Sequence, residues 1–211
     1  MQIDTGLKAY VPSILGGIPD KPDSVPDETA ILFWKSQETY KKSFNMLAMR
    51  IYSLVHQPVF AFPESKADFP ILFNGSLVSD QPVYLFDKPA DWMNGDIKHL
   101  VAARPSKIDS NEFYTIISET LSRIQNQVSL EGAIACVGED YLVYWELSAN
   151  VTSSDDQASG ISLLNEVLPN WKQNFIAESK SIPVGLWNNW NGINVHPGDC
   201  FNMKFHRRED I

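Results

Sequence analysis

The order of strand-like and helix-like patterns after residue 97 constrains this 211-residue chain more than any other feature. Residues 97–103 and 133–137 are short apolar runs typical of strands, and residues 111–128 carry apolar side chains at helical spacing. A further strand pattern at 141–147 follows a three-residue turn, which predicts a hairpin. Another helical stripe and a last strand at 199–205 close the chain. The order is therefore strand, helix, strand, strand, helix, strand.

This order predicts an α+β fold, the ferredoxin-like split βαβ arrangement, in which an antiparallel sheet carries its helices on one face. We expect three segments: a Pro/Gly-rich arm at 1–28, an N-terminal α+β half at 29–96 and a C-terminal ferredoxin-like half at 97–211. Six Pro and Gly residues between positions 12 and 28 favour an arm, because proline lacks a backbone donor and fixes φ. The strand and helix at 29–55 are expected to belong either to a second, imperfect copy that shares one core with the first or to an added layer.

Helix boundaries follow from capping residues and apolar stripes. Ser36 can cap a helix at 37–55, whose stripe we expect to face the core; the stripe comprises Tyr40, Phe44, Leu47, Ile51 and Leu54. Asp109, with Glu112 three residues on, resembles a capping box for the helix at 111–128. The third stripe runs from Ile161 to Phe175, with Pro169 expected to kink or split it.

The net charge of −9 disfavours nucleic-acid and membrane-surface partners, because both carry negative charge. The N-terminus lacks the basic and apolar regions of a secretory signal, so we expect a soluble, cytoplasmic protein. Cys136 and Cys200 are then expected to be free thiols, with one long-range disulfide as the alternative.

A resemblance is carried by residues 31–40, which read Ile-Leu-Phe-Trp-Lys-Ser-Gln-Glu-Thr-Tyr. This strand-to-helix step, with the element order of the second half, is similar to the dimeric α+β barrel superfamily, which includes antibiotic-biosynthesis-monooxygenase-like and stress-responsive barrel proteins. The chain is about twice the length of one such domain, and its arm is additional. The resemblance implies a curved sheet around an apolar cavity, between sheet and helices or between two sheets. It implies no catalytic residue.

Potential metal ligands gather near the C-terminus, at His196, Asp199, Cys200 and His206. Pro197 and Gly198 between them are also what a hairpin turn uses, and no pair has the spacing of a known metal motif. We therefore expect a structural loop, no metal and no cofactor. Glycine-rich phosphate loops, nucleophile elbows and dinucleotide fingerprints are missing as well.

Aromatic and basic side chains supply the remaining candidates. Trp187 and Trp190 lie in an Asn-rich turn that can stack on a flat polar ligand or cover the core. Arg104, at the end of a strand, can hold an anionic substrate or pair with a nearby acid. Trp34, Tyr144 and Trp145 are expected at the wall of an aromatic pocket.

Two function classes remain open. The first is a small-molecule-binding α+β barrel-like protein, extending to a cofactor-independent oxygenase or related enzyme on an apolar or aromatic substrate. His99 and His196 are its candidate proton-transfer groups, although a structural imidazole is the plainer interpretation of His99. The alternative is a non-enzymatic interaction or ligand-binding protein that uses the Trp187–Trp190 turn, with a homodimer as the expected assembly. The sequence leaves open whether the chain is an enzyme.

Overall fold

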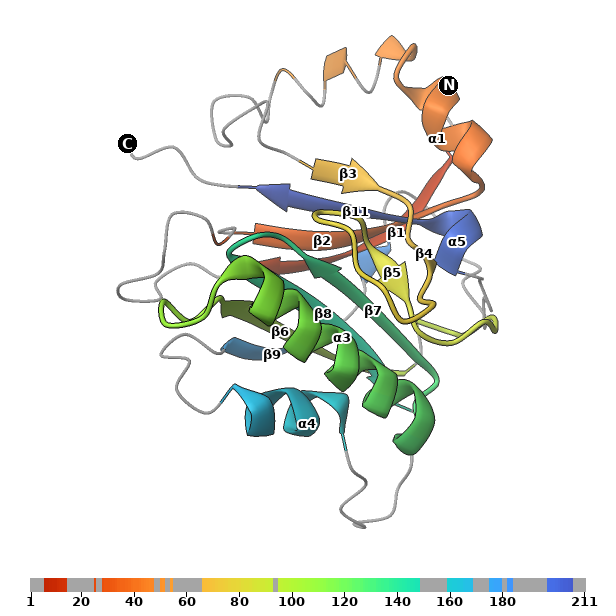
Figure 1. The fold of residues 1–211 in the computed structure, drawn as a ribbon. Helices are drawn as coiled ribbons and strands as arrows, with labels where there is room; N and C mark the ends of the chain where they lie inside the picture. The colour runs from red at the N-terminus through yellow and green to blue at the C-terminus, as the bar shows by residue number, and fades with distance from the viewer. Residues whose placement is uncertain are drawn as a thin grey trace.

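Two β-sheets lie face to face in the computed structural model of this chain, and the longer helices lie on their outer sides (Figure 1). The structure describes residues 6–14, 25, 28–47, 50–51, 54, 66–92, 95–148, 159–168, 175–179, 182–183 and 197–206. The helices are α1 (Gln37–Ser43), α3 (Ser110–Gln127), α4 (Gly160–Val167) and the short α5 (Pro197–Cys200). The predicted α+β class is therefore confirmed.

The second sheet contains most of the patterns that the sequence analysis identified. Its strands, in spatial order, are β4 (Ile71–Leu72), β5 (Val83–Tyr84), β7 (Gly132–Val137), β8 (Tyr141–Ser148), β6 (Asp96–Ala103) and β9 (Phe175–Ser179). β8 lies between β6 and β7 and is antiparallel to both, while β9 is antiparallel to the other side of β6. The elements β6-α3-β7-β8-α4-β9 thus follow one another in the chain order that the patterns predicted.

The first sheet differs more from expectation. Its spatial order is β10 (Ile182–Pro183), β1 (Leu7–Ile14), β2 (Glu28–Trp34), β11 (Phe201–His206) and β3 (Lys66–Asp68). Residues 7–14, expected within an arm, pair along their length with β2. Pro12 is tolerated because β10 pairs only with Ala9 and Tyr10, so the described sheet leaves one side of β1 open at Pro12.

The last strand also lies elsewhere than the segment boundaries suggested. β11 pairs with β2 and β3, so the C-terminal strand completes the first sheet rather than the second. The last strand of the predicted element order is instead β9, which begins at Phe175, a residue that the sequence pattern assigned to a helix. Segments 29–96 and 97–211 therefore both contribute strands to the first sheet.

Three apolar clusters fill the spaces between the layers of the fold. Between the sheets, Val11, Ile31 and Phe33 of the first sheet pack against the second sheet. There the odd-numbered residues of β8, from Tyr141 to Leu147, face them together with residues of the neighbouring strands. On the outer face of the second sheet, α3 and α4 bury side chains that include Phe113, Ile117, Leu121, Ile124, Ile161 and Leu164. On the outer face of the first sheet, Tyr40 of α1 packs with residues that include Leu32, Trp34 and Phe69.

The predicted caps Ser36 and Asp109 are confirmed, and Ser159, which the sequence analysis did not name, caps α4. The side chains of Ser36, Asp109 and Ser159 each accept a backbone N–H three residues on. The apolar stripe that was expected to face the core does so only at its first residue. Tyr40 is buried, but the other four side chains are each at least 51% exposed, namely Phe44, Leu47, Ile51 and Leu54. Within the described segments, no helix is both long and apolar enough to cross a membrane.

Candidate functional site

His99 lies at the contact between the two sheets. It lies on the same face of β6 as Ile97 and Val101, which belong to the cluster between the sheets, and none of its surface is exposed. Its Nε2 is 3.0 Å from Oγ1 of Thr29, a buried residue of β2 in the first sheet. A polar contact thus joins the two sheets through their shared core.

Trp145 of β8 lies directly opposite His99 in the register of the second sheet. The two rings are stacked, with centroids 4.8 Å apart and an interplanar angle of 28°. His99 Nδ1 and Trp145 Nε1 are both buried and have no hydrogen-bond partner in the described part of the chain. Since leaving a buried polar atom unpaired costs roughly 1–3 kcal/mol, two such atoms on stacked rings identify this core as a candidate binding site.

Burial lowers the pKa of His99 from 6.5 to about 3. The imidazole is therefore neutral at pH 7, with one nitrogen acting as donor and the other as acceptor. A base with so low a pKa takes up protons poorly at neutral pH, whereas its hydrogen-bonding capacity is unaffected. The site as it stands is better suited to orienting a ligand than to abstracting a proton.

Tyr144 and Glu146 lie on the opposite face of β8, which packs against α3 and α4. The Tyr144 hydroxyl donates to Glu146 Oε2 over 3.1 Å, and the backbone N–H of Ile161 donates to the same oxygen over 3.1 Å. The pKa of Tyr144 is raised well above its usual value, first by burial and then by the neighbouring Glu146 carboxylate. Tyr144 and Trp145, predicted to line one pocket, therefore point to opposite faces of β8.

Trp34 belongs to a third apolar cluster, on the outer face of the first sheet. It is buried on the outer face of β2 and makes an edge contact with Tyr40, with ring centroids 5.1 Å apart. Along β2, Thr29, Ile31 and Phe33 face the second sheet, so Trp34 points away from His99. The structure brings together two predicted site residues, His99 and Trp145, and separates them from Trp34 and Tyr144.

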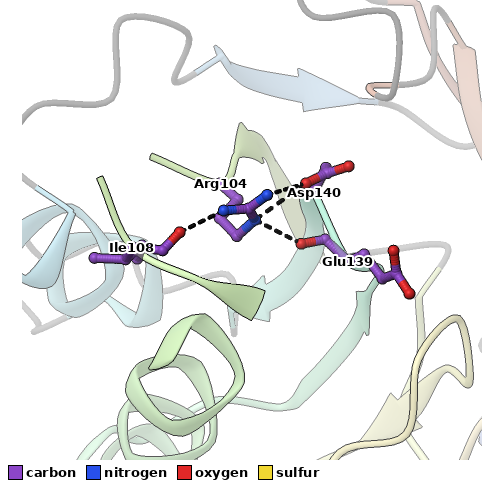
Figure 2. A network of polar contacts seen from close by, with 4 residues as sticks. All are labelled: Arg104, Ile108, Glu139 and Asp140. Carbon is purple, nitrogen blue, oxygen red and sulfur yellow. Dashed lines mark hydrogen bonds and ion pairs between the residues drawn. The ribbon is translucent and has the colours of Figure 1, made fainter. Parts of the chain in front are cut away.

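Arg104 follows β6 and is linked to the β7–β8 turn by a hydrogen bond and an ion pair, as Figure 2 shows. Its Nε donates to the carbonyl of Glu139 over 2.9 Å, and its Nη2 is 2.5 Å from Asp140 Oδ1. Nη1 donates to the carbonyl of Ile108. The ion pair that was one interpretation of Arg104 is present, and the binding of an anionic substrate there stays a prediction.

Several predicted residues lie outside the described part of the chain, namely His196, Trp187 and Trp190. The strand and helix that carry Asp199, Cys200 and His206 are described, but their side chains are not. Elsewhere in the described ranges, no three His, Cys, Asp or Glu side chains form a group that can hold a metal ion. Cys136 carries a buried thiol outside any disulfide.

Sequence reasoning missed two residues of these sites. Thr29 is the polar residue at the start of an apolar strand, and nothing local indicates that it faces a histidine 70 positions away. Glu146 is the one charged residue in the apolar run 141–147. Because charged residues are rarely buried without partners, this charge within an apolar strand was the signal that could have identified it.

Comparisons with protein-family models, with curated proteins and with solved structures each find no significant match to this chain.

Proposed function

We propose that this protein binds a small apolar or aromatic molecule between its two sheets, and that the molecule carries one hydrogen-bonding group. The observation that supports this most is the stacked pair His99 and Trp145, each with a buried nitrogen that has no partner among the described residues. A single ligand oxygen can accept from Trp145 Nε1 and, as a hydroxyl, also bond to His99 Nδ1. The surrounding apolar cluster suits the remainder of such a ligand.

The architecture supports the proposal independently. Two sheets face each other across an apolar core, with helices on the outside, as expected for a barrel-like protein of the dimeric α+β barrel type. We propose that β6-α3-β7-β8-α4-β9 is its ferredoxin-like unit, since β8 separates β6 from β7 and all four strands pair antiparallel. The first sheet then takes the place of the second unit.

An enzymatic role is an extension of this binding function. A cofactor-independent oxygenase would use the same apolar site to exclude water and orient an oxidisable aromatic substrate. In that reaction His99 would hold the substrate hydroxyl, because a group with a pKa of about 3 is a weak base at neutral pH. An anionic ligand beside the imidazole would raise this pKa toward a useful range.

The binding proposal can be tested with a matched pair of probes, 2-naphthol and naphthalene, which differ by one hydroxyl. We expect 2-naphthol to raise the Tm more than naphthalene in the unaltered protein. Trp145→Phe keeps an aromatic ring but removes the indole N–H. The ratio of the apparent affinities for 2-naphthol and naphthalene should therefore fall about tenfold, the equivalent of about 1.4 kcal/mol.

Trp34→Phe is the matched control. It also removes a buried indole N–H without a described partner, but from the outer face of the first sheet. The advantage of 2-naphthol should persist in Trp34→Phe. Equal effects of the two substitutions, or no preference for 2-naphthol in the unaltered protein, would reject a site at Trp145.

The alternative function, an interaction protein that uses the Trp187–Trp190 turn, stays a prediction, as do the homodimer and the cytoplasmic location. Sedimentation velocity of the unaltered protein tests the homodimer directly. A double substitution Trp187→Ala and Trp190→Ala that shifts the sedimentation coefficient toward the monomer would favour this alternative.

A further inference from the structure

We infer that Glu146 is a second binding site, on the opposite face of β8 from His99, and that it takes the primary ammonium group of a small organic cation. This inference does not depend on the proposed function, because the two sites lie on different faces of the sheet.

Glu146 is completely buried, yet only one of its carboxylate oxygens has a partner. Oε2 accepts from the Tyr144 hydroxyl and from the N–H of Ile161, in the first turn of α4. Oε1 has no hydrogen-bond partner in the described part of the chain. The carboxylate is therefore held in a fixed orientation by one oxygen, while the other remains available.

The packing around Oε2 is close and specific. A Cβ added to Gly160 would come within 2.2 Å of the Tyr144 hydroxyl oxygen and 2.8 Å of Glu146 Oε2. Glycine at this position therefore allows the start of α4 to approach the carboxylate. The N-terminal end of a helix carries a partial positive charge of about half a unit, which offsets only part of the negative charge of Glu146.

The residual charge has no cationic partner among the described residues, since no ion pair involves Glu146. Lys98 lies directly opposite Glu146 on β6, on the same face of the sheet, and is partly exposed. Its ammonium group nevertheless makes no ion pair with the carboxylate. Lys98 thus lies beside the site but does not occupy it.

An ammonium group fits the open oxygen better than the alternatives. Burying an uncompensated carboxylate costs several kcal/mol, and a charge-assisted hydrogen bond is about twice as strong as a neutral one. A metal ion would need further ligands, and the described chain has no group of three His, Cys, Asp or Glu that can hold one. A primary ammonium supplies both the positive charge and an N–H donor for Oε1.

The test uses butylammonium chloride and tetramethylammonium chloride at constant ionic strength, because the second cation has the same charge but no N–H donor. We expect butylammonium to raise the Tm saturably, and tetramethylammonium to leave it unchanged. Glu146→Gln should weaken the apparent affinity for butylammonium at least about tenfold, since it removes the charge and keeps the shape. Glu166→Gln, at an exposed position of α4, should bind butylammonium as the unaltered protein does.

Two further measurements keep the inference testable if Glu146→Gln does not fold. The amide signal of Ile161, which donates to Glu146, should shift with butylammonium in the NMR spectrum of the unaltered protein. Lys98→Met should bind butylammonium as well as the unaltered protein or better, since a competing cation is removed. An unchanged Ile161 signal, equal effects of both cations, or full binding by Glu146→Gln would overturn the inference. If Lys98 occupies the site in solution, butylammonium should change the Tm of Lys98→Met but not that of the unaltered protein. That result would also overturn the inference.

Discussion

His99 and Trp145 lie directly opposite each other on β6 and β8, with their rings stacked at 4.8 Å inside the core between the sheets. On its other side, His99 contacts Thr29 of the first sheet at 3.0 Å. The imidazole therefore belongs to the packing of both sheets. Any change in its protonation or its partners should affect the stability of the whole fold.

Acid should destabilise the protein through His99. The pKa of this side chain is about 3 in the folded chain and 6.5 in the unfolded one. Above pH 6.5 neither state is protonated, so His99 makes no difference. Below pH 6.5 only the unfolded state binds the proton, and the free energy of unfolding should fall by about 1.4 kcal/mol per pH unit until about pH 3. Urea unfolding at about pH 7, 6 and 5 measures this slope.

The control is His99→Gln, which removes the titrating group. The carboxylates common to both proteins contribute equally, so the difference between the two pH profiles isolates His99. Parallel profiles between about pH 7 and 5 would contradict the buried neutral imidazole.

Thr29→Val should destabilise the protein by about 1–3 kcal/mol, because it leaves Nε2 of the buried His99 without its hydroxyl partner. Thr29→Ser keeps the hydroxyl and removes one methyl group, so it should cost only about 1 kcal/mol. Chemical denaturation of the three proteins compares these values. Equal losses for Val and Ser would mean that the contact contributes nothing beyond packing.

Arg104→Lys should also be costly. The guanidinium binds the Asp140 carboxylate and the carbonyls of Glu139 and Ile108, and a lysine ammonium cannot reproduce this planar geometry (Figure 2). We expect a loss of about 1–2 kcal/mol in the free energy of unfolding, since Arg104 is only 24% exposed. Arg123→Lys is the matched control, because that arginine is 43% exposed and its nearest carboxylate oxygen is 3.7 Å away. Similar losses at the two positions would argue against a specific role for Arg104.

Local sequence signals predicted α3 and the β7–β8 hairpin of the second sheet well. The Asp109 carboxylate accepts the N–H of Glu112, as its spacing indicated, and α3 begins at the next residue. The β7–β8 hairpin follows from its short turn and from the apolar runs on either side. These features depend on interactions between residues close in the chain, which a single sequence reveals.

The missed elements depend on contacts between distant segments. β1 contains Pro12, so its local pattern argued against a strand, and its pairing with β2 and β10 makes it one. Phe175 continued a helical stripe, but pairing opposite Val101 of β6 places it in β9. Tertiary pairing outweighed local propensity in both cases.

The candidate site was predictable only in part. His99 and Trp145 were each selected from their own surroundings, but their contact follows from the register between β6 and β8, which no local pattern specifies. Thr29 completes the site from the other sheet, and the packing of one sheet on the other cannot be inferred from a single sequence. Tyr144 and Trp145 are neighbours in the sequence and therefore face opposite sides of β8, Trp145 toward the first sheet and Tyr144 toward α3 and α4.

The exposed stripe after α1 provides a last prediction. Leu47 is 68% exposed, whereas Leu121 of α3 is completely buried, although both lie in apolar stripes of similar sequence character. Leu121→Ala should cost about 2–5 kcal/mol, because it removes buried apolar surface and leaves a cavity. Leu47→Ala should change the free energy of unfolding by less than about 0.5 kcal/mol, as expected for a surface position. Urea denaturation at two protein concentrations measures both. A large and concentration-dependent loss for Leu47→Ala would show that the stripe is buried against a second copy of the chain, and not exposed as in the isolated fold.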